Sequence, residues 1–327
     1  MPHMANTQTN DFSKGSVAGN ILRLALPMTV AQLINVLYSV VDRMYIGRLP
    51  DAAGNALTGL GLTFPILSIV TAFANLFGMG GSPLFSIQRG KGDRDRAQVI
   101  LGNTFALLVG TGVALTVVLL VLKRPLLYAF GASDATYPYA DGYLTIYLLG
   151  SIFVMISLGM NQFINAQGFG RTGMLTVLIG AVTNILLDPV FIFVLGMGVQ
   201  GAALATILSQ FLSAVWAVSF LRGKKALIRL EWGSMRLQPK LVWQIVSLGF
   251  SSFVMAITNS IVQVACNSTL QSFGGDLYVG VMTIINSVRE VVSTPINGVT
   301  SAAQPVMGFN YGAQEYRRVR SGNVFTT

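Results

Sequence analysis

The sequence has very few of the residues on which most enzyme chemistry depends. Of its 327 residues, one is cysteine, one is histidine and only 10% are charged. The single cysteine, Cys266, cannot form an internal disulfide, and the single histidine, His3, cannot belong to a histidine metal cluster. Thiol catalysis, zinc chemistry and histidine general-base chemistry are therefore without support. We expect the chain not to be an enzyme and to have no cofactor and no metal centre of these kinds.

Apolar residues dominate the composition. They make up 53% of the chain, and the mean hydropathy is +0.64, well above the values typical of soluble domains. Residues 1–20 are polar, and the apolar run that follows is too long for the core of a signal peptide. The composition therefore predicts a membrane protein whose first apolar run stays in place as a membrane span.

Eight apolar stretches are long enough to cross a bilayer as helices, at about 20 residues for each span. They cover residues 21–47, 56–86, 98–122, 142–165, 174–195, 201–221, 242–271 and 278–308. The sequence therefore predicts an all-α, polytopic membrane protein, a helical bundle of about eight transmembrane helices.

The net charge of +9 could indicate a nucleic-acid partner, but the position of the basic residues argues against this. Of the 21 Lys and Arg residues, 16 lie in segments that would share one side of the membrane, and three lie in segments on the other side. The positive-inside rule then places the N-terminus in the cytoplasm. We expect a monomer in the cell membrane whose partner is the lipid bilayer and not nucleic acid.

A weak internal repeat runs at a constant shift of 222 residues. It pairs Gly90 with Gly312 and Arg96 with Arg318, among other positions. Such a repeat predicts a duplicated bundle, and because each unit would hold six spans, both copies should have the same orientation. The second copy contains only two spans. We therefore expect the chain to be a C-terminally incomplete form of a twelve-span protein.

The repeat and the charge pattern divide the chain into four parts. These are a polar leader at 1–20, a six-helix lobe at 21–221, a cytoplasmic basic linker at 222–241, and an incomplete second lobe of two helices and a basic tail at 242–327. The linker lies where the two copies of the repeat join.

An acidic side chain lies inside the fifth predicted span, where a carboxylate is costly enough to suggest a function. Asn184 and Asp188 are four residues apart, so they share a helix face, and Pro189 follows. Thr206 lies as far after a turn near Met197 as Asp188 lies before it, so antiparallel helices would bring both to one depth. Oxygen-bearing groups that meet near the bilayer centre predict a site for a cation or a proton.

A second acid, Asp42, belongs to a polar stripe on the first span. The stripe consists of Gln32, Asn35, Ser39 and Asp42. Such a stripe could serve only to form hydrogen bonds between helices, but neutral side chains are sufficient for that role and an acid in the membrane is not needed. If Asp42 lies close to Asp188 in a poorly solvated lobe, the two acids cannot both ionise at low cost, and a proton or a cation is then expected between them. Pro27, in the same span, predicts either a hinge or a static kink.

Polar stripes recur on several other spans, and lipid does not solvate so many polar faces. We therefore expect the stripes to line a shared hydrated cavity. The predicted cavity residues are Gln32, Asn35, Tyr38, Asn161, Asn286 and Glu290. The net acidity of the few intramembrane charges favours small organic cations as ligands.

Four stretches carry a family resemblance: LPMTVAQLINVLYSVVDRMYIG, GSPLFSIQRGKGD, NILLDPVFIFVLGMGVQGAALAT and AAQPVMGFNYGA. They resemble the multidrug and toxic compound extrusion (MATE) transporters, in particular the archaeal and DinF-like branch, and the resemblance covers the chain from about residue 16 onward. It implies a twelve-helix exporter of two six-helix lobes, driven by inward movement of Na⁺ or H⁺.

The resemblance also implies an ion-coupling site in the first lobe. The family positions fall here on Asp42, Asn184, Asp188 and Thr206, which polarity and depth also single out. The implied function is antiport of cationic or amphipathic organic compounds, including drugs, against Na⁺ or H⁺. The alternative is a lipid-linked oligosaccharide or polysaccharide flippase of the same superfamily, which abundant basic residues in the cavity would favour.

Overall fold

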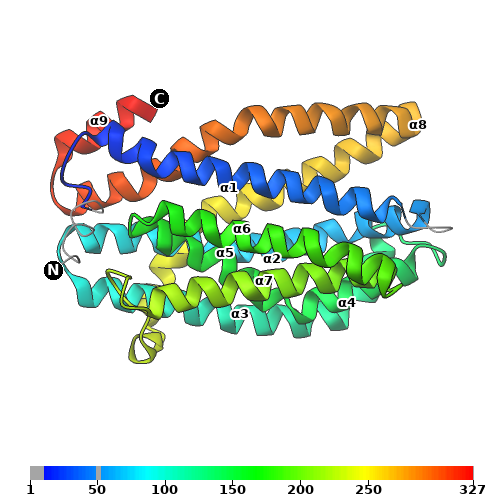
Figure 1. Ribbon diagram of the computed structural model, residues 1–327, viewed down its shortest axis with the longest axis horizontal. Helices are drawn as coiled ribbons and strands as arrows, with labels where there is room; N and C mark the ends of the chain where they lie inside the picture. Colours follow the sequence, from blue (N-terminus) through cyan, green and yellow to red (C-terminus); the bar gives the residue numbers. More distant parts are fainter. Residues whose placement is uncertain (1–10, 49–52, 327) are drawn as a thin grey trace.

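A computed structural model describes residues 11–48 and 53–326, and all regular elements in these ranges are helical. The long helices run side by side along one elongated bundle (Figure 1). The principal helices are α1 (Val17–Ile46), α2 (Ala53–Gly90), α3 (Arg94–Ala129), α4 (Tyr137–Leu149), α5 (Ser151–Ala166), α6 (Gly170–Pro189), α7 (Gly198–Arg222), α8 (Pro239–Gly312) and α9 (Tyr316–Thr326). The prediction of an all-α bundle is confirmed.

Several of these helices have the length and hydropathy of membrane spans. Among the described residues there are six such helices, or seven if the bent pair α4 and α5 counts as one span. The chain is therefore a multi-pass membrane protein, as its hydropathy predicts. The predicted span 278–308 is not among them, although it is helical.

One predicted span is broken into two helices. The sequence predicts a continuous span over 142–165, whereas α4 and α5 meet at Gly150 with a bend of 55°. A side chain at Gly150 would collide with Ile207 of α7. The missing Cβ therefore lets α7 come close at the point where the span breaks.

The element α8 is a helical hairpin. Its outgoing limb, yellow in Figure 1, and its returning limb, orange, run back along each other. The amide of Asn286 donates a hydrogen bond to Gln263 Oε1 at 3.4 Å, although a straight helix would hold two residues 23 apart about 35 Å from each other. The helical assignment continues through residues 272–277, where the sequence predicts a connection between two spans.

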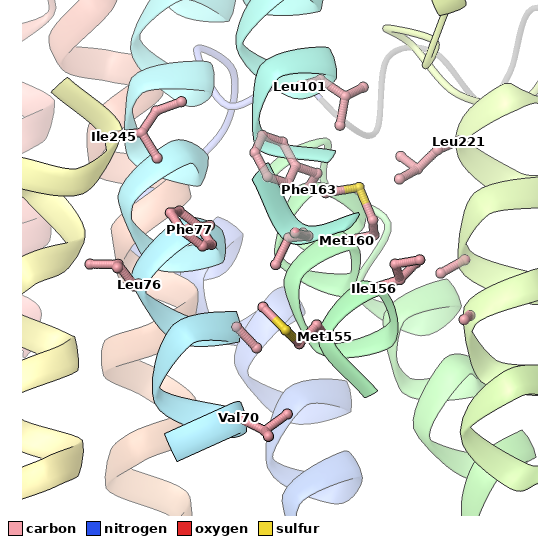
Figure 2. Close-up of a cluster of buried hydrophobic side chains, with 14 of the residues drawn as sticks. Val70, Leu76, Phe77, Leu101, Met155, Ile156, Met160, Phe163, Leu221 and Ile245 are labelled. Atoms are coloured by element: carbon pink, nitrogen blue, oxygen red, sulfur yellow. The ribbon is translucent and has the colours of Figure 1, made fainter. Parts of the chain in front are cut away.

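Helix α5 occupies the centre of the main apolar core (Figure 2). Its side chains Met155, Met160 and Phe163 are fully buried among residues of α2, α3 and α7. Phe163 packs edge to face on Phe85 of α2, with ring centroids 5.3 Å apart. Close packing of this kind holds helices together in a bilayer, where lipid is as apolar as the side chains.

Glycines let the backbones of α2 and α8 touch. A Cβ at Gly90 would collide with the carbonyl oxygen of Phe309, and a Cβ at Gly312 would collide with that of Ile87. The 222-residue shift exchanges these two contacts, because it maps Gly90 onto Gly312 and Ile87 onto Phe309. A two-fold relation between similar units produces such reciprocal contacts. We call these four residues the glycine seam.

The N-terminal segment covers the same end of the bundle. Phe12 is 3% exposed; its ring lies 5.0 Å from the guanidinium carbon of Arg89 on α2 and 5.8 Å from the ring of Phe309 on α8. Arg318 of α9 donates hydrogen bonds to the carbonyl oxygens of Phe12 and Gly15, each at 2.9 Å. The segment thus joins the six-helix lobe to α8 and α9.

The linker between α7 and α8 is docked on the six-helix lobe by two fully buried amides. Gln167 accepts a hydrogen bond from the N–H of Ile228 at 3.0 Å and donates to its carbonyl oxygen at 3.1 Å. Asn103 donates to the carbonyl oxygen of Ser234 at 3.2 Å and accepts from the N–H of Gln238 at 2.8 Å. The sequence predicts a basic linker here but not this fixed path.

Replacement of Asn103 tests the docking of the linker. Asn103→Ala leaves buried backbone groups of the linker without their partners, at a cost of about 1–3 kcal/mol for each group. We expect a lower melting temperature of the purified protein in detergent. Gln238→Ala is the matched control, because it removes an exposed side-chain amide and keeps the backbone N–H that Asn103 accepts. Equal melting temperatures for the two variants would contradict the docking.

Replacement of Arg318 tests the attachment of the N-terminal segment. Arg318→Ala removes the donors to the carbonyl oxygens of Phe12 and Gly15, so hydrogen–deuterium exchange over residues 11–16 should become faster. Arg317→Ala, an exposed neighbour on the same helix, should leave the exchange unchanged. Unchanged exchange in Arg318→Ala would mean that the apolar contacts of Phe12 hold the segment without these hydrogen bonds.

Candidate functional site

Asp188 lies where the helical geometry of the chain changes. Helix α6 ends at Pro189, and residues Val190–Val194 continue as a single π-helical turn, η2, in which Leu195 N–H donates to the Val190 carbonyl oxygen at 2.9 Å. Proline has no N–H to give to the preceding turn, which accounts for a change of helical geometry at this point. Single π-helical turns occur frequently at functional sites.

Asn184, Asp188 and Thr206 form one buried polar cluster. The Asn184 amide donates to Asp188 Oδ1 at 3.2 Å and to Thr206 Oγ1 at 3.4 Å. Asp188 is completely buried and Asn184 is 1% exposed. The structure therefore brings together the three side chains that helix spacing and depth predict to meet.

Asp42 of α1 completes the cluster. Its carboxyl group lies close enough to that of Asp188 for a side-chain hydrogen bond. Ionised carboxylates have only acceptor atoms and repel each other, so a proton on one carboxyl or a cation between the two would stabilise this arrangement. Within the described part of the chain, Asp188 Oδ2 and Asn184 Oδ1 are buried and accept no hydrogen bond. The cluster thus presents oxygen lone pairs to a positively charged species.

Two tyrosines of α4 stand beside this cluster, and the sequence analysis does not single them out. Tyr143 is buried next to Asp42 and near enough to Thr206 for a side-chain hydrogen bond. Its ring stacks on that of Tyr147, with centroids 6.1 Å apart. The sequence does contain a feature that could have indicated them, which is a pair of tyrosines four residues apart in an apolar span. A buried tyrosine hydroxyl usually needs a polar partner, so the pair indicates a polar group nearby.

A small polar cavity of about 30 Å³ lies one helical turn from the cluster. Its lining includes Asn35 and Tyr38 of α1, Ser157 of α5, Gly180 of α6 and Gln210 of α7. Tyr38 is four residues from Asp42, and Gln210 is four residues from Thr206, so each pair shares a helix face. The cavity has room for one or two water molecules.

The other predicted cavity residues are more widely spread. Gln32 is half-buried on α1, and Asn161 is half-buried on α5, facing Gly173 of α6. Asn286 lies on the returning limb of α8, where it is bonded to Gln263. The side chain of Glu290 lies outside the described part of the structure. The structure thus unites Asn35 and Tyr38 in one cavity and places Asn286 on the separate α8 hairpin.

Pro27, the predicted hinge, lies inside the continuous helix α1. It packs against the start of α6, where a Cβ at Gly170 would lie 3.0 Å from Pro27 Cγ. It also lines a cleft of about 580 Å³ together with Arg23 and Arg171. The cleft leaves space beside α1 at the residue where the sequence predicts either a bend or a kink.

The residues that the structure describes contain no group of three or more His, Cys, Asp or Glu side chains that could hold a metal ion. The candidate site is therefore a pair of acids with neutral oxygen-bearing neighbours.

Comparisons with known proteins match nearly the whole chain. The MatE family model matches residues 27–190 and 251–325. The multidrug export protein MepA of Staphylococcus saprophyticus is 25% identical over 318 residues, which cover 96% of this chain and 69% of the relative. MepA of Staphylococcus aureus is 24% identical over 318 residues, with the same coverage.

A solved structure has the same arrangement of helices. It shows the outward-facing conformation of a multidrug resistance MATE family transporter of the MOP superfamily. The two structures superpose with a TM-score of 0.90 at 25% identity, over 98% of this chain and 70% of the other.

Proposed function

Because the chain belongs to the MatE family of membrane transporters, we propose that it exports small organic compounds in exchange for a cation that moves inward. The name of the MepA relatives, multidrug export proteins, supports this function. The observation that carries the proposal is the contact between the buried carboxyl groups of Asp42 and Asp188, with Asn184 and Thr206 beside them. A transporter needs such a site in order to draw on an ion gradient.

The oxygens of the cluster suit either H⁺ or Na⁺. A proton would bridge the two carboxyl groups, whereas Na⁺ could also use the neutral oxygens of Asn184 and Thr206, because hard cations prefer oxygen ligands. The two ions therefore compete for the same atoms. A membrane potential contributes about 2.3 kcal/mol per charge for each 100 mV, enough to shift the occupancy of the site.

Occupancy of the cluster would act on the neighbouring cavity through α1. Asp42 and Tyr38 lie on the same face of this helix, so a cation that draws Asp42 toward Asp188 also moves the cavity wall. The cleft beside Pro27 provides room for the helix to bend. Cation binding and the shape of the cavity are thereby coupled through one helix.

The cavity is too small for an organic substrate in the conformation described. Sites for drug-sized ligands occupy about 300–1,000 Å³, and this cavity has about 30 Å³. Substrate binding would therefore require α1 to move outward. We propose that cationic or amphipathic compounds then meet Gln32, Asn35, Tyr38 and Asn161, with Asn286 and Glu290 on the opposite helices.

The closed end of the bundle supports a proposal about the state of the protein. Phe12 and the glycine seam cover one end, and the similar solved structure is described as outward-facing. We propose that the closed end is cytoplasmic, that the cavity would open to the outside, and that the protein works as a monomer in the cell membrane. The basic residues at the closed end agree with this orientation.

A flippase of the same superfamily is the alternative function. Lipid-linked sugars carry phosphate groups, which basic side chains would have to hold in the cavity. The cavity lining of Asn35, Tyr38, Ser157 and Gln210 is neutral, and the nearby charges are acids. The geometry therefore favours export of cations over transfer of anionic lipids.

Neutralisation of the two acids tests the proposed coupling site. Asp42→Asn and Asp188→Asn keep the size of each side chain but remove the carboxylate, so each should abolish concentrative efflux of an organic cation from liposomes under imposed Na⁺ or H⁺ gradients. Asp95→Asn, an exposed acid on α3, is the matched control and should transport normally. If both cluster variants fold and transport with unchanged dependence on pH and Na⁺, the carboxyl groups are structural.

The role of Thr206 is tested by direct ion binding. Thr206→Val keeps the shape of the side chain and removes its oxygen, so we expect the affinity for ²²Na⁺ to fall about tenfold, equivalent to about 1.4 kcal/mol. Thr206→Ser keeps the hydroxyl group and should bind nearly as well as the unmodified protein. Equal affinities for Val and Ser variants would remove Thr206 from the set of ligands.

A further inference from the structure

The linker between α7 and α8 has two faces of opposite character. Its inner face packs on the six-helix lobe through Ala226, Ile228 and Leu230, all of which are buried. Its outer face, at residues 222–240, carries exposed basic side chains: Arg222, Lys224, Lys225, Arg229, Arg236 and Lys240. Glu231 is the single acid in this stretch of the sequence. The outer face is therefore strongly positive.

Large apolar side chains are exposed among these charges. Trp232 is 69% exposed, Leu237 is 51% exposed, and Trp243, at the start of α8, is 73% exposed. The guanidinium carbon of Arg222 lies 5.0 Å from the centre of the Trp232 ring. Water solvates such apolar groups poorly, whereas tryptophan beside basic residues is typical of the boundary between membrane and water.

The position of the linker along α3 agrees with this boundary. The carbonyl oxygen of Ser234 contacts Asn103 and lies so close to Gly102 that a Cβ there would collide with it. Gly102 is eight residues from the exposed, charged start of α3 at Arg94, which is about 12 Å along the helix. The headgroup layer is about 5–8 Å thick on each side of the hydrocarbon core. If the start of α3 lies in water, a point about 12 Å further along the helix lies at the depth of this layer. Figure 1 shows the linker, in yellow-green, standing out from the side of the bundle.

The docking of the linker holds this face in place. Because Gln167 and Asn103 hold its backbone, the linker has little conformational entropy left to lose when a ligand binds. A free, disordered loop of the same composition would have to be ordered at that moment. The charges therefore form a preorganised surface.

We propose that the outer face of the linker binds the headgroups of anionic phospholipids in the membrane. Its lysine and arginine side chains contact the lipid phosphates, while Trp232 and Leu237 enter the boundary of the acyl chains. Each basic side chain near an anionic surface strengthens the association up to about fivefold. The ligand is a lipid and not a soluble phosphate, because a soluble anion would leave the apolar side chains in water.

Trp232 can report on the lipids that surround it. The chain has three tryptophans, so W216F/W243F leaves Trp232 as the single probe. Trp232 fluorescence is measured in nanodiscs that contain equal mole fractions of phosphatidylglycerol and phosphatidylcholine, with one of the two lipids brominated. Brominated phosphatidylglycerol should quench Trp232 at least about threefold more strongly than brominated phosphatidylcholine, because several basic side chains enrich the anionic lipid around the linker. Melting temperatures show that each variant remains folded.

Two triple substitutions, made in this W216F/W243F background, distinguish the effect of the linker charges on the quenching ratio from the effect of other exposed basic residues. K224Q/K225Q/R229Q removes three charges from the outer face and should bring the quenching ratio close to one. K91Q/R94Q/R96Q removes three exposed charges from the connection between α2 and α3 and from the first turn of α3, and should leave the ratio high. Inorganic phosphate, added to the solution, should not compete with phosphatidylglycerol.

Three results would overturn the proposal. The first is equal quenching by the two lipids, or emission typical of a tryptophan in water, when the linker charges are intact. The second is a ratio that K224Q/K225Q/R229Q does not lower. The third is competition by inorganic phosphate, which would assign the surface to a soluble anion.

Discussion

The contact between two carboxyl groups in the interior of a membrane protein is the constraint on which the rest of the first lobe depends. Asp42 and Asp188 come from α1 and α6, so their contact places these two helices side by side, and the proposed cation or proton would reduce the repulsion between them. Asn184 and Thr206 supply neutral oxygens around it, and the π-helical turn after Pro189 follows directly. Without the proposed cation or proton, two ionised carboxylates would repel each other across the contact between α1 and α6.

Among the residues whose side chains are described, the buried contacts between α1 and α8 lie toward one end of the bundle. There the buried side chains of Leu24 and Ile21 on α1 pack against Ala302 and Val306 on α8. At the other end, the turn of the α8 hairpin presents Phe273, which is 84% exposed. The described contacts that join α8 to the preceding helices therefore lie toward the end of the bundle that Phe12 covers.

Much of the fold and part of the candidate site follow from sequence because lipid leaves the backbone few choices. Apolar length predicts the helices, and regular helix geometry predicts that Asn184, Asp188 and Thr206 meet. The break at Gly150 could not be predicted, since glycine is common in membrane helices and its cause is a contact with Ile207 on a distant helix. Tyr143 was missed for the same reason: its polar partners lie on α1 and α7. Likewise, polar stripes indicate a cavity without indicating which stripes face each other.

The glycine seam determines how closely α2 and α8 can approach each other. At Gly90 and Gly312 the two helices meet backbone against backbone, and beside this contact the guanidinium carbon of Arg89 lies 5.0 Å from the centre of the Phe309 ring. Because the two glycines occupy equivalent places in the repeat, α2 and α8 meet through equivalent positions, and the contact is symmetric. A side chain at either glycine would push the two helices apart, so the close approach of α2 to α8 depends on both positions.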